Sequence, residues 1–191
     1  MIASPATRTR IILTAIALGL VLAHLGWEHL NGGVPSHHFL ARADMPAISN
    51  WWGAVLIPAL SWFLVGRIQS RIARQEADDP GESRRIPMVA AGFLAALAYG
   101  AAIALAFTMN SAAVSYIFLG LFALSLFVRT YRAEYVLGFV FGMTFTFGAV
   151  LPTLAASVVA SFSGIVHFVL RSVRRLIQNT RAPGPAARDL S

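Results

Sequence analysis

The sequence predicts an all-α membrane protein, a polytopic bundle of six transmembrane helices with both termini in the cytoplasm. Two observations predict this class. Of the 191 residues, 57% are hydrophobic and only 12% are charged, whereas a soluble domain carries about 25% charged residues. The apolar residues also gather in runs close to the ~20 residues that a membrane-spanning helix needs. A third observation, the placement of the arginines, predicts the orientation of these runs.

The first half of the chain contains three apolar runs, which predict spans at 11–30, 51–68 and 87–107. The first run has a basic start and small residues, as a cleavable signal peptide does, but we expect it to be retained as an anchor. Residues 31–50 are too polar to span and are predicted to form an external loop. Trp51 and Trp52 then mark the start of the second span, because aromatic residues favour the membrane–water interface.

The second half predicts a fourth span at 112–128, followed by one apolar stretch from Tyr135 to Leu170. As a single helix this stretch would reach about 54 Å, against roughly 30 Å of hydrocarbon. We therefore expect a turn near Pro152 that gives spans 135–151 and 154–171. The alternative is one long kinked helix, and five helices in total.

The six spans would form a single domain, residues 1–179. The remaining residues, 180–191, are rich in alanine and proline, and we expect this tail to be disordered.

All 15 basic residues are arginines, and their positions favour six helices over five. Six helices place every arginine except Arg42 on one side of the membrane, which the positive-inside rule identifies as the cytoplasm. This predicts a bacterial-type inner-membrane protein. The high pI could also suggest nucleic acid, but the arginines lie at the ends of apolar runs. We therefore expect membrane lipids, and no nucleic acid, as their partners.

Missing residue types exclude several kinds of chemistry. The chain has no cysteine and no lysine, which excludes disulfides, thiolate metal sites, cysteine nucleophiles and lysine Schiff bases. No acidic residue falls in the middle of a predicted span, which argues against a proton pump or an intramembrane aspartyl protease.

One cluster of polar residues near the external face predicts a candidate site. His24 and Glu28 are four residues apart and therefore share a helix face. His37 and His38 follow a Gly-Gly loop that can fold them back over this face. Histidine and carboxylate are common ligands of zinc and non-haem iron. We predict a metal site with His24, Glu28, His37 and His38 as ligands, oriented by His29, Asn31 and Asp44.

The sequence leaves other functions open. The same cluster is compatible with a structural polar network, or with a pH-sensing or substrate-binding site. The whole chain is also compatible with a small oligomeric transporter or channel for a neutral solute. That hypothesis uses the ridge of small residues on which a second helix can approach closely, Gly92, Ala96, Gly100 and Ala104. A third hypothesis is a non-catalytic subunit or assembly factor of a membrane complex. Whether the chain is an enzyme is not predicted.

Overall fold

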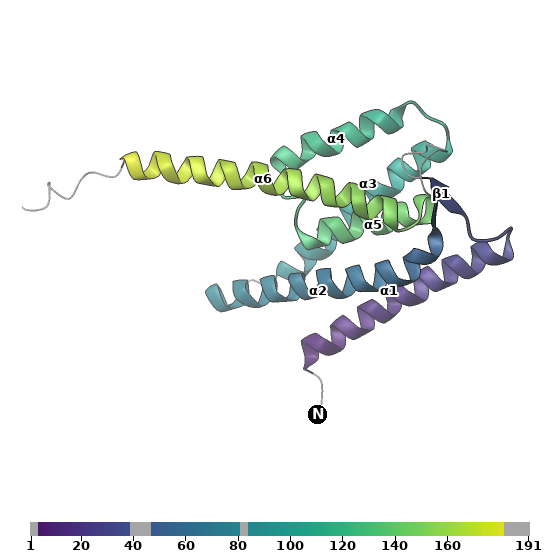
Figure 1. Cartoon of the computed structure of the whole chain (residues 1–191). Helices are drawn as coiled ribbons and strands as arrows, with labels where there is room; N and C mark the ends of the chain where they lie inside the picture. The colour runs from purple at the N-terminus through teal and green to yellow at the C-terminus, as the bar shows by residue number, and fades with distance from the viewer. Residues whose placement is uncertain (1–3, 39–46, 81–83, 182–191) are drawn as a thin grey trace, which may run out of the picture.

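The computed structural model describes residues 4–38, 47–80 and 84–181. Within them the chain forms six α-helices and one short β-hairpin (Figure 1). The helices are α1 Pro5–Leu30, α2 Gly53–Asp78, α3 Arg85–Thr108, α4 Ala113–Phe127, α5 Ala133–Phe147 and α6 Val150–Arg181. The strands are β1 Ser36–His38 and β2 Ala47–Ser49, and a 3-10 turn, η2 Asn50–Trp52, leads into α2. The predicted all-α membrane class is confirmed, with six helices and not five.

The helices differ in length from the predicted spans. Among the described residues, α1, α2, α3 and α6 are long and apolar enough to cross a membrane. By contrast, α4 and α5 have 15 residues each, or about 22 Å, less than the hydrocarbon thickness. Many large apolar side chains on the outside of the bundle are exposed. Such a surface is a liability in water but suits contact with lipid.

The turn between α5 and α6 lies earlier than the sequence predicts. It falls at Gly148, whose φ of +68° lies in a region that favours glycine. Pro152 is instead the third residue of α6. It fits there because the first N–H groups of a helix have no intrahelical partner. The prediction of two helices is confirmed, whereas the expected position of the turn, near Pro152, is wrong.

The segment predicted as an external loop contains regular structure. β1 pairs antiparallel with β2, with His37 opposite Ile48. The strand pair brings the residues just before α2 back to the end of α1. The predicted disordered tail lies almost entirely outside the described residues, since α6 ends at Arg181.

The ridge of small residues on α3 packs against α5, and these two helices make the most extensive helix contact of the bundle. A Cβ atom built on Gly142 would lie 2.3 Å from the Leu97 carbonyl oxygen, and one built on Gly138 would lie 2.2 Å from the Phe93 oxygen. The two backbones are therefore in direct contact. This close approach explains the spacing of small residues on both helices.

The bundle has two chemically different ends. The end where α1 stops and α2 begins carries His24 and the β-hairpin, and we call it the histidine end; it lies on the right in Figure 1. The opposite end, where α2 stops and α5 begins, carries Arg67, Arg71 and Arg132, and we call it the arginine end.

Candidate polar site at the histidine end

The last turns of α1 carry the two central residues of the candidate site. Nε2 of His24 lies 3.4 Å from Oε1 of Glu28, and the side chains are only 13% and 12% exposed. Val21 and Leu25 are buried beside them on the same helix. The apolar face of α1 therefore holds this polar pair against the bundle.

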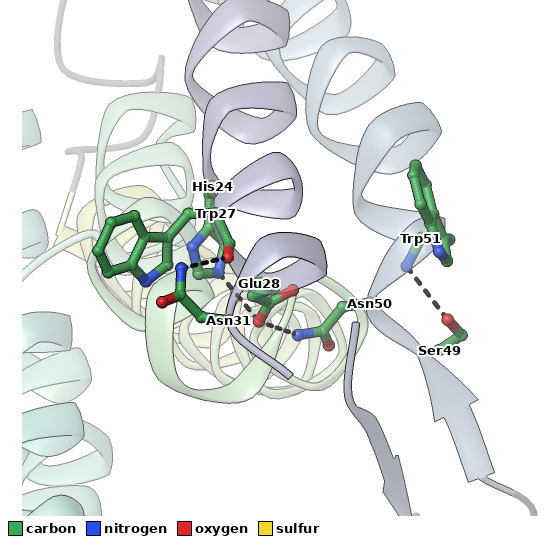
Figure 2. A network of polar contacts seen from close by, with 7 residues as sticks. All are labelled: His24, Trp27, Glu28, Asn31, Ser49, Asn50 and Trp51. Carbon is green, nitrogen blue, oxygen red and sulfur yellow. Dashed lines mark hydrogen bonds and ion pairs between the residues drawn. The ribbon is translucent and has the colours of Figure 1, made fainter. Parts of the chain in front are cut away.

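Asn50, which directly follows strand β2, contacts Glu28 of the pair (Figure 2). Its Nδ2 donates a hydrogen bond of 2.8 Å to Oε1 of Glu28, and its backbone N–H donates to the Pro35 carbonyl over 3.1 Å. Asn50 is 6% exposed. Gly148 leaves the space that the amide occupies, because a Cβ there would lie 2.2 Å from Oδ1 of Asn50. Glu28 is thus fixed by a neutral donor.

Part of the site's hydrogen-bonding capacity is unused. Nδ1 of His24 and Oε2 of Glu28 are buried with no hydrogen-bond partner among the described residues, and Nε2 of His24 has only its 3.4 Å contact with Glu28. The His24 ring packs against Phe145, with the ring centroids 4.6 Å apart. A buried polar group left without a partner costs about 1–3 kcal/mol. The site can therefore accept a further polar ligand or a cation.

The other predicted site residues have different surroundings. Asn31 donates from Nδ2 to the Trp27 carbonyl over 2.8 Å (Figure 2), so its amide satisfies the end of α1 and makes no bond to the pair. His29 is exposed. The backbones of His37 and His38 form β1, but their side chains, like the whole of Asp44, lie outside what the structure describes.

The described residues do not complete the predicted metal centre. Of the four predicted ligands, only the side chains of His24 and Glu28 are described, and the structure brings these two together. No group of three or more histidine, cysteine, aspartate or glutamate side chains in the described ranges is arranged to hold a metal ion.

Sequence reasoning missed Asn50. It sits at the predicted end of a loop, and its role depends on the hairpin that returns it to Glu28, 22 residues earlier in the chain. No local spacing indicates such a contact. The sequence predicts the neighbouring Trp51 and Trp52 as interfacial residues, and both side chains are exposed.

A substitution at Asn50 tests the importance of this donor. We expect Asn50→Ala to lower the free energy of unfolding by about 1–3 kcal/mol, because the buried Glu28 carboxylate loses its hydrogen-bond donor. Thermal unfolding in a mild detergent measures the effect. The matched control is Ser49→Ala, because among the described residues the Ser49 hydroxyl only accepts a 3.4 Å bond from the Trp51 N–H. Equal effects of the two substitutions would contradict this role of Asn50.

A second buried charge lies at the arginine end. Glu134 is 2% exposed and accepts a 2.9 Å ion-pair hydrogen bond from Nη1 of Arg71. The sequence indicates only that Glu134 suits the first turn of a helix, and its place in α5 agrees. The sequence does not identify Arg71 on α2 as its partner, because 63 residues separate the two.

The fold defines the class of the protein: a helical membrane bundle, which carries one polar pair near each end. No protein-family model, no curated protein and no solved structure matches the chain. Its own residues and contacts are therefore the basis for assigning a function.

Proposed function

We propose that the chain is a multi-pass inner-membrane protein that binds a divalent metal ion, zinc or non-haem iron, at His24 and Glu28. The observation that carries the proposal is the buried pair itself. Its two facing atoms, His24 Nε2 and Glu28 Oε1, lie 3.4 Å apart, while His24 Nδ1 and Glu28 Oε2 have no hydrogen-bond partner in the described part of the chain.

The separation of the pair suits a shared ion. Zinc bonds to nitrogen and oxygen at about 2.0–2.2 Å, so two ligand atoms of a tetrahedral site lie roughly 3.3–3.5 Å apart. Asn50 donates to Glu28 and would orient this ligand, as outer partners do in metal sites. The Phe145 ring restricts the His24 imidazole. Two ligands alone do not make a stable centre.

The proposal assigns the remaining ligands to His37 and His38. Their strand begins directly after Pro35, whose carbonyl is bonded to the Asn50 backbone, and Asn50 is itself bonded to Glu28. The hairpin is therefore anchored beside the pair. Asp44 and His29 are proposed to orient the ligands. The arginines at the opposite end favour its placement in the cytoplasm, so the metal site would face outward.

The transporter hypothesis loses its main support. It relied on a free ridge of small residues on α3, but Gly92 and Gly100 face α5 within the same chain. A ridge that is occupied in this way does not provide a seam between subunits.

Metal analysis of protein purified without chelators tests the proposal. We expect close to one equivalent of zinc or iron in the wild type, and below about 0.1 equivalent in His24→Ala and Glu28→Gln. His167→Ala is the control. The His167 ring is hydrogen-bonded to the Ser163 carbonyl on α6, so its removal should leave the metal content unchanged. A wild type that stays below about 0.1 equivalent after incubation with either metal would exclude the site.

A further inference from the structure

A second site is formed at the arginine end, independent of the proposed metal site. α2, the start of α5 and α6 enclose a cavity of about 860 Å³ that is open to the outside. Four guanidinium groups line it, and we call it the arginine cleft: Arg67, Arg71, Arg74 and Arg132.

Positive charge in the arginine cleft exceeds negative charge. Glu134 compensates Arg71 through their ion pair of 2.9 Å. No carboxylate in the described ranges lies within ion-pair distance of Arg67, Arg74 or Arg132. Clustered guanidinium groups repel one another, and an anion placed among them relieves this repulsion. The cleft therefore favours an anionic ligand.

The lining changes from apolar to basic along one face of α2. Leu60 and Leu64 line the inner part, and Arg67, Arg71 and Arg74 follow at spacings of three and four residues. From Leu60 to Arg74 the helix rises by about 21 Å. The facing wall on α6 consists of small residues, which leave room for a chain. A soluble anion would fill only the basic part.

We propose that the arginine cleft binds an anionic phospholipid, with the phosphate among the arginines and part of an acyl chain along Leu60 and Leu64. Guanidinium groups bind phosphate through paired hydrogen bonds, which gives them an advantage over lysine at such sites. The mixed lining fits a ligand with a charged head and an apolar tail. Free inorganic phosphate shares the head chemistry and must be distinguished by experiment.

Lipid binding to the full chain in a neutral detergent tests the proposal by native mass spectrometry. We expect phosphatidylglycerol to bind, and phosphatidylcholine to bind at least about tenfold more weakly. Millimolar inorganic phosphate should not displace the lipid. Equal binding of the two lipids, or displacement by phosphate, would overturn the assignment to an anionic lipid.

Paired variants locate the binding site. The double variant Arg67→Gln/Arg74→Gln should weaken phosphatidylglycerol binding by about thirtyfold. It keeps Arg71, which has a structural partner. Arg174→Gln/Arg175→Gln removes the same charge from exposed positions on α6 and should leave binding close to wild type. Arg132→Gln serves as an independent variant if the double variant does not fold. Equal losses in the cleft and control variants would overturn the site.

Discussion

Replacing Gly142 by alanine should lower the free energy of unfolding by about 2–4 kcal/mol, although alanine is the better helix former. The added methyl carbon would lie 2.3 Å from the Leu97 carbonyl oxygen and 2.8 Å from the Ala101 nitrogen. Both are backbone atoms of α3, so they cannot rotate away. The two helices would have to separate along their whole contact, with loss of van der Waals packing.

Glycine elsewhere in the bundle provides the control for this experiment. A Cβ on Gly164 in α6 would meet no atom within 4 Å, so Gly164→Ala should be neutral or slightly stabilising. Reversible unfolding in mixed detergent micelles gives both free energies. Gly100→Ala approaches the same contact from α3, because its Cβ would lie 2.6 Å from the Phe139 oxygen, and should resemble Gly142→Ala. Equal stability of the Gly142 and Gly164 variants would rule out this account of the α3–α5 contact.

The glycine contact shows how far the sequence determines the fold. The four-residue spacing on α3 predicts a smooth face for close helix approach, and the structure has such an approach. The spacing does not identify the partner, because a ridge on one helix fits another helix of the same chain or of a second chain. The matching glycines on α5 identified the partner only once the two helices were placed side by side.

Turns were harder to predict than helices. Apolar runs locate the helices because their length must match the membrane. The sequence predicts the last turn near Pro152, because the apolar stretch is too long for one span and proline often interrupts a helix. The structure uses Gly148, whose positive φ reverses the chain, while proline fits the first turn of the next helix. Either residue can mark a boundary, and spacing alone does not separate their roles.

Of the three polar contacts described above, the sequence predicts one. The contact between His24 and Glu28 follows from helical geometry, because residues four apart share a face. The bond from Asn50 to Glu28 requires the hairpin to close. The ion pair between Arg71 and Glu134 likewise requires α2 and α5 to pack together. Contacts across helices depend on tertiary packing, which a single sequence does not reveal.

The ion pair at the arginine end leads to the second large expected effect. Arg71→Ala should lower the free energy of unfolding by about 3 kcal/mol. The Glu134 side chain is only 3% exposed beside Arg71, and without the guanidinium its carboxylate would lose its charged partner. Glu134→Gln should lower the free energy of unfolding by less than Arg71→Ala does. A buried neutral amide has a smaller desolvation penalty than an unpaired carboxylate, and Arg71 is partly exposed, at 27%.

The double variant separates the cost of an unpaired charge from the net value of the pair. Arg71→Ala/Glu134→Gln should be more stable than Arg71→Ala alone, because it buries no unpaired carboxylate. Arg74→Ala, three residues along α2, is the matched control. It has no carboxylate partner among the described residues and should change stability by less than about 0.5 kcal/mol.

These unfolding measurements belong in a non-ionic detergent without anionic lipid. Under that condition the arginine cleft is expected to be empty, so a lipid cannot mask the loss of Arg71 or add a penalty to the loss of Arg74. If Arg71→Ala and Arg74→Ala then destabilise the bundle equally, the ion pair between Arg71 and Glu134 makes no particular contribution to stability. If only Arg71→Ala lowers the free energy of unfolding, the ion pair with the buried Glu134 stabilises the packing of α2 against α5. The neighbouring arginines then remain free to bind an anionic headgroup.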